Sequence, residues 1–148
     1  MRVVLVAAVL AWAGAAAGQG MPTGRWLTQD RDAVIAIEPC GTALCGQIVG
    51  ITLDHPDDPT PVDNMGRPQC GLTIITGAVP DGEAWAMQIL DPRNGAAYRA
   101  RMHVDTQGRL QVRGFIGIPL LGRTQAWTPY AGVLTPDCIL PRPSSAVP

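Results

Sequence analysis

Short apolar runs, separated by turn-forming residues, make up most of the chain beyond residue 24. In residues 98–104 apolar and polar side chains alternate. The apolar positions are Tyr98, Ala100, Met102 and Val104, and the polar positions are Arg99, Arg101 and His103. A period of two is typical of a strand with one buried and one exposed face. The Asn94-Gly95 pair between two such runs favours a hairpin turn. The pattern predicts strands joined by tight turns.

The runs predict about eight strands. They are expected near residues 26–28, 33–38, 44–53, 71–79, 84–90, 98–104, 110–116 and 123–128. Residues 54–69 are polar, contain four prolines and are expected to form a loop. Successive hairpins indicate an up-and-down meander, and closure into a barrel would remove its exposed edges. We therefore expect an all-β fold, a single antiparallel barrel whose interior is either filled or holds one small ligand.

The first residues are typical of a secretory leader. Arg2 precedes an apolar stretch at 3–12, and three alanines end at Ala17. The stretch is shorter than the roughly 20 residues of a membrane-spanning helix. The predicted organisation is a signal peptide at 1–17, a barrel domain at 18–128 and a Pro-rich tail at 129–148. A periplasmic or secreted location follows, with no membrane span after cleavage.

Composition excludes several kinds of chemistry. Charged residues are 16% of the chain and the net charge is −1, which argues against nucleic-acid binding. The chain has no Lys, which removes a P-loop and a Schiff base. Its only serines are Ser144 and Ser145, close to the C-terminus. The chain is therefore not expected to be an enzyme, and no cofactor is implied.

Four cysteines follow the leader: Cys40, Cys45, Cys70 and Cys138. An even number in an exported chain predicts two disulfides, with three possible pairings. A bridge between Cys40 and Cys45 would staple a turn, and one between Cys70 and Cys138 would hold the tail against the body. A zinc site is the alternative, but no second ligand pair stands at a suitable spacing.

Several motifs are shared with a known family. They are Gly24-x-Trp26-x-Thr28, Cys40-Gly41-x-x-Leu44-Cys45-Gly46-x-Ile48, Arg67-Pro68-x-x-Gly71-Leu72, Asp91-Pro92-x-x-Gly95-x-x-Tyr98 and Arg113-Gly114-x-x-Gly117-x-Pro119-Leu120-Leu121-Gly122-Arg123-Thr124-x-x-Trp127. With these the chain resembles domain-of-unknown-function family 2147, small exported bacterial proteins. The resemblance implies a lipocalin-like barrel and no particular activity. A short 54–69 linker and a long tail that carries Cys138 depart from the family pattern.

Four residues are expected to be structural: Gly24, Trp26, Arg123 and Trp127. Trp26 would plug one end of the barrel, and an arginine of a late strand would stack on it. Arg123 is the first candidate for this stack and Arg113 the second.

The 54–69 loop gathers Asp54, His55, Asp57, Asp58, Asp63 and Asn64. Calcium or zinc accepts such ligands, but the spacing fits no EF-hand and a solvated loop is the simpler interpretation. We assign no metal site.

His55 and His103 are the only histidines. They have no evident nucleophile if all cysteines are bridged, so no catalytic residue is assigned either.

Residues 115–122 form an unusually apolar connection between the last two strands. We expect the segment to cap a barrel end, and the alternative is a lid or contact surface at a ligand mouth. The expected interior or mouth residues are Trp85, Met87, Tyr98, Met102, Phe115 and Leu120. The leading hypothesis is a binding module for a small apolar ligand. The alternatives are an envelope protein-interaction or inhibitor module that uses the 117–122 loop, and an enzyme of unknown type.

Overall fold

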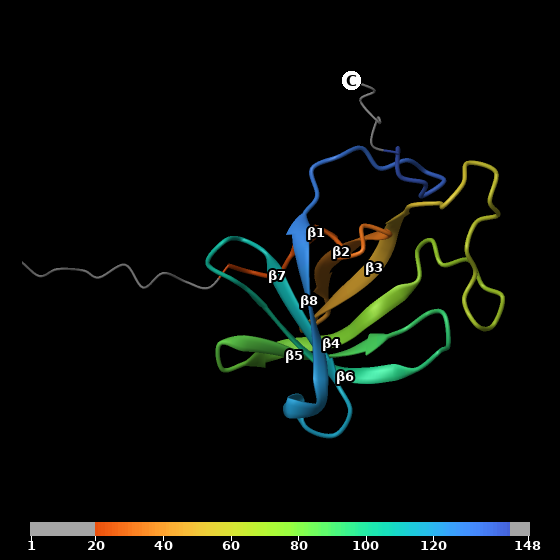
Figure 1. The fold of residues 1–148 in the computed structure, drawn as a ribbon. Coiled ribbons are helices and arrows are strands. Elements are labelled where there is room, and N and C mark those ends of the chain that lie inside the picture. The colour runs from red at the N-terminus through yellow and green to blue at the C-terminus, as the bar shows by residue number, and fades with distance from the viewer. Residues whose placement is uncertain (1–19, 143–148) are drawn as a thin grey trace, which may run out of the picture.

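The computed structural model describes residues 20–142, which form eight strands and one 3₁₀ turn (Figure 1). The elements are β1 (Gly24–Leu27), β2 (Ala33–Cys40), β3 (Ala43–Ile51), β4 (Thr73–Asp81), β5 (Ala84–Leu90), β6 (Ala97–Val104), β7 (Leu110–Phe115), η1 (Pro119–Leu121) and β8 (Gly122–Pro129). Each strand pairs antiparallel with the next, and β1 pairs with β8. The predicted closed up-and-down barrel is confirmed. The predicted signal peptide lies outside the described residues.

Local turn chemistry explains the hairpins. Between β5 and β6, Gly95 has a φ of 74°, and the Asn94 side chain accepts a hydrogen bond from the Ala96 N–H at 2.8 Å. Between β6 and β7, the Asp105 carboxylate accepts hydrogen bonds from backbone N–H groups and from the Gln111 amide. These hydrogen bonds hold the pKa of Asp105 well below its usual value, because they stabilise the ionised carboxylate. The bond from the Arg109 N–H has the largest effect on this pKa, followed by the bond from the Gln111 amide.

The interior is filled from both halves of the barrel. Because β-strand side chains alternate, inward positions recur at every second residue. The residues that belong to the interior cluster and are at most 2% exposed are Ile35, Ile37, Ile75, Ala78, Ala100, Met102 and Leu110. Gly46 keeps β3 close to this cluster, because a Cβ there would lie 3.0 Å from Ile75. The middle of the barrel is thus a packed apolar core.

The connections divide the barrel into two ends. The β1–β2, β3–β4, β5–β6 and β7–β8 connections lie at one end, which we call the hairpin end. The β2–β3, β4–β5 and β6–β7 turns lie at the opposite end. There a disulfide joins Cys40 and Cys45 across the β2–β3 turn.

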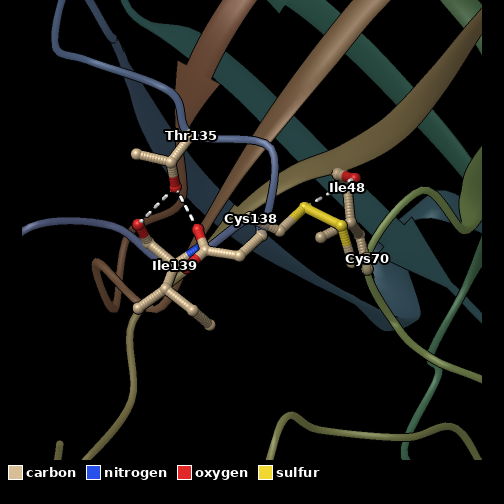
Figure 2. The surroundings of a disulfide bond; sticks show 6 residues. Ile48, Cys70, Thr135, Cys138 and Ile139 are labelled. Carbon is tan, nitrogen blue, oxygen red and sulfur yellow. Dashed lines mark hydrogen bonds between the residues drawn. A yellow bond between two sulfur atoms is a disulfide. The ribbon is translucent and has the colours of Figure 1, made fainter.

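The C-terminal tail returns along the outside of β1, β2 and β3. Ile139 forms a parallel bridge with Ile51, and Leu140 packs with Leu27 and Val34 in a small outer cluster. Figure 2 shows the second disulfide, in which Cys138 of the tail joins Cys70 before β4. Both predicted disulfides are therefore present, and the Cys70–Cys138 bridge fastens the tail to the body.

The 54–69 loop is organised around one buried carboxylate. Asp63 accepts hydrogen bonds from the Met65 and Arg67 N–H groups and forms a 2.7 Å ion pair with the Arg67 guanidinium. Burial by itself would raise the pKa of Asp63, but these bonds and the Arg67 charge outweigh it and lower the pKa. Asp63 therefore serves the loop's own structure.

No helix that is long and apolar enough to cross a membrane occurs in residues 20–142.

Candidate binding site at the hairpin end

Two rows of cross-strand neighbours run across the inner wall formed by β5, β6, β7 and β8. One row is Trp85, Met102, Val112 and Gln125, and the other is Met87, Ala100, Gly114 and Arg123. Directly paired residues share one face of a sheet. Three of the predicted ligand residues, Trp85, Met87 and Met102, therefore lie together on the inner wall.

These three predicted residues belong to the packed part of the barrel. Met102 is fully buried, Met87 is 6% exposed and Trp85 is partly buried against the same cluster. Tyr98 pairs with Ile89 nearer the hairpin end and is partly exposed. The accessible part of the inner wall therefore begins beyond Met87 and Met102.

Gln125 and Arg123 point to the inner side of β8, yet both are exposed. Trp127 fixes this direction, because it is 3% exposed in the interior cluster and its Nε1 donates a 2.9 Å hydrogen bond to Gln125 Oε1. Residues 127, 125 and 123 share one face. The inner face of the first half of β8 is therefore exposed to solvent, and we call this place the opening.

The opening follows from incomplete pairing of β8. On its β1 side only two residues have strand partners, Pro129 with Trp26 and Thr128 with Leu27. Further along, the Ala126 N–H donates to the Gln29 side chain at 2.9 Å in place of a strand partner. Among the described residues, no strand pairs with residues 122–127 on this side. The barrel wall thus ends early next to Arg123 and Gln125.

Small residues widen the inner wall at the same place. Gly114 has no side chain, and a Cβ built on it would meet only Ile89 Cγ2, at 3.9 Å. The cross-strand partner of Gly114 in β6 is the small residue Ala100. Arg123 completes this row and has no hydrogen bond or ion pair with any residue in the described part of the chain. An apolar wall and an unpaired guanidinium therefore meet at the opening.

Sequence reasoning missed Gln125 and misplaced Arg123. The available signal was alternation within β8: once Trp127 is taken as inward, residues 125 and 123 must be inward as well. The expected stack of an arginine on Trp26 is wrong. The β8 pairing places Trp26 opposite Pro129 and Arg123 opposite Gly114, so the two lie far apart along the strand. Arg113 bonds to Thr124 and Leu120 at the hairpin end instead.

Trp26 itself is buried, and its Nε1 donates a 2.8 Å hydrogen bond to the Pro22 carbonyl oxygen. Gly24, at the start of β1, has a φ of 118°, which favours glycine. Both residues lie near the end of β8, away from the opening.

Phe115 lies on the outer face of the barrel. It pairs with Arg99, and the Arg99 guanidinium carbon stands 5.9 Å from the centre of the Phe115 ring. The ring is 7% exposed without belonging to the interior cluster. Phe115 therefore supports the base of the β7–β8 hairpin from outside, in contrast to the interior position expected from the sequence.

The β7–β8 connection, residues 116–121, does not cap the barrel. We call it the hairpin tip. Its aliphatic side chains are exposed, with Ile116 at 72%, Ile118 at 55%, Leu120 at 81% and Leu121 at 68%. Figure 1 shows the β7–β8 connection extending beyond the barrel wall. The cap expected from the sequence is wrong, because the strands carry the tip past the end of the core.

Other reactive side chains are dispersed. His55 and His103 are both exposed on separate elements. All four cysteines are disulfide-bonded. Within residues 20–142, no group of three or more His, Cys, Asp and Glu side chains is placed to hold a metal ion. The hairpin end is thus the site that the geometry favours.

Comparison with solved structures finds a barrel of the same kind. The chain is similar to a structure described as protein HP1028 from the human pathogen Helicobacter pylori, which belongs to the lipocalin family. The TM-score is 0.61 at 11% identity, covering 74% of this chain and 82% of the other. This similarity concerns the fold. The comparison with curated proteins returned no match. The model of a bacterial family described as "Uncharacterized protein conserved in bacteria (DUF2147)" matches residues 24–129, and the chain belongs to this family.

Proposed function

We propose that the protein is an exported binding module that holds a small, mostly apolar molecule at the hairpin end of its barrel. One observation carries the proposal: Arg123 and Gln125 face the barrel interior and are nevertheless exposed. Ligand sites combine an apolar wall with a few polar groups that set orientation. Ile89, Tyr98 and Gly114 supply the wall here.

The polar pair favours a particular kind of ligand. Arg123 is a permanent cation without a partner among the described residues. The Gln125 amide is held in place by Trp127. An apolar molecule with one acceptor or acidic group would satisfy the guanidinium and leave its chain against the wall. The proposal includes no catalytic step.

A titration with a fluorescent fatty-acid analogue tests this function. We expect saturable binding of one probe per chain. Arg123→Leu should weaken it about tenfold or more, because hydrogen bonds to charged groups contribute about 1.5–3 kcal/mol. Gly114→Val should also weaken it by filling the inner wall. His103→Leu, an exposed outer-face change, is the control and should bind as the wild type does.

Native mass spectrometry of protein purified from its own envelope gives an independent check. A mass excess that organic solvent releases would identify the natural ligand. A bare mass that does not increase after exposure to lipid extract would overturn the proposal, as would probe binding that neither variant changes.

Export is part of the proposal. Two disulfides form and persist in oxidising compartments, and the first residues are typical of a signal peptide. Cell fractionation with a C-terminal tag should find the processed chain in the periplasm or the medium. A cytoplasmic, unprocessed chain would contradict this.

A further inference from the structure

We propose that the hairpin tip, residues 116–121, docks the protein on an anionic phospholipid surface. Four exposed aliphatic side chains gather on one short connection, Ile116, Ile118, Leu120 and Leu121. Exposed apolar patches of this kind mark contact surfaces. A projecting tip with side chains of this length reaches the boundary between headgroups and acyl chains, where apolar groups are buried.

The positive charge around the tip favours an anionic lipid surface over a neutral one. The chain has no Asp or Glu between Asp105 and Asp137. Arg99, Arg113 and Arg123 stand at the base of the hairpin on three adjacent strands. Basic residues next to inserted apolar groups are the combination that binds anionic membranes.

Three acidic groups at the hairpin end act on Arg93. Asp91 is paired with it at 3.2 Å in the adjacent β5–β6 turn, and Asp30 and Asp32 of the β1–β2 turn also attract its positive charge. Within residues 20–142, Arg123 has no hydrogen bond or ion pair, and Arg99 interacts only with the Phe115 ring. The base of the hairpin therefore keeps exposed positive charge available for phosphate groups.

The tip is held in shape before any contact. The Arg113 guanidinium donates hydrogen bonds to Thr124 Oγ1 and to the Leu120 carbonyl oxygen. Gly122 lets the two strands approach, because a Cβ there would lie 2.5 Å from the Gly114 carbonyl oxygen. A preorganised tip loses little conformational entropy on binding.

Vesicle flotation with the full processed chain tests the inference. The vesicles are phosphatidylcholine alone, or phosphatidylcholine partly replaced by phosphatidylglycerol. We expect binding to the anionic vesicles that high salt weakens. Leu120→Asp and Leu121→Asp should each reduce partitioning about tenfold or more. Arg123→Gln should reduce it about fivefold.

Val133→Asp is the matched control, because Val133 is 67% exposed, as Leu121 is 68% exposed, but lies in the tail. It should float as the wild type does. Equal flotation of all variants, or none with the wild type, would overturn the inference. The inference would also be overturned if the protein bound no vesicles and Leu120 instead mediated contact with an envelope protein or with a second copy of the chain. Circular dichroism checks that each variant is folded. We expect no change, because the substituted side chains are exposed.

Discussion

The side chain of Leu140 occupies the space above Gly50. A Cβ on Gly50 would lie 2.5 Å from Leu140 Cδ2, closer than atoms can approach. Gly50 lies in β3 and Leu140 in the tail, with the Leu140 N–H donating to the Ile51 carbonyl oxygen at 2.8 Å. The missing side chain in the wall is thus what lets the tail lie flat on the barrel.

Gly50→Ala should therefore displace the tail and destabilise the fold by about 1–3 kcal/mol, the usual cost of overpacking. Urea unfolding measures this. If the contact with Leu140 is the cause, the substitution should cost less in a Leu140→Ala background. Additive costs in the double-mutant cycle would mean that another contact is responsible.

The two disulfides should contribute unequally. Cys70 and Cys138 are 68 residues apart in sequence and Cys40 and Cys45 only 5. Chain entropy predicts a loss of about 4 kcal/mol on removing the long bridge and about 2 kcal/mol on removing the short one. Paired Cys→Ala variants compared by urea unfolding measure both. A larger loss for the Cys40–Cys45 pair would contradict this order.

Acid should destabilise the protein through Asp63 and Asp105. Both pKa values lie below the ordinary 3.8 in the folded chain. The unfolded chain therefore binds more protons as pH falls through that value. The stability from these carboxylates is present above it and is lost progressively as pH falls towards their folded pKa values. Unfolding free energies across this range should decline less steeply for Asp63→Asn than for the wild type. Parallel curves would show that Asp63 makes no such contribution.

Met102 and Leu120 should differ sharply although both were predicted as ligand residues. Met102 is fully buried in the interior cluster, whereas Leu120 is 81% exposed. Met102→Ala should cost about 2–5 kcal/mol through the cavity it leaves, and Leu120→Ala should stay within about 0.5 kcal/mol of the wild type. Thermal melts of the two variants decide this. A large loss for Leu120→Ala would mean that the tip packs on the body.

Much of the fold was predictable because it is encoded locally. Alternation in residues 98–104 sets which side chains of β6 face inward, and Asn94-Gly95 marks the hairpin before it. The even number of cysteines predicted two bridges. These signals need only neighbouring residues, since strand period and turn conformation are properties of a few consecutive peptide units.

Tertiary structure alone decided that the candidate site is exposed. Whether Arg123 and Gln125 are buried or open depends on how far β1 extends beside β8, and their sequence neighbours do not specify this. Phe115 shares the outer face of β7 with Gln111 and Arg113, and it is covered there because Arg99 of the next strand lies over its ring. The tip is exposed because β7 and β8 outrun the core. Exposure is set by which distant segments cover a residue. The sequence alone thus determined strand period, turns and fold class, while barrel closure determined where the interior opens and which apolar residues meet solvent.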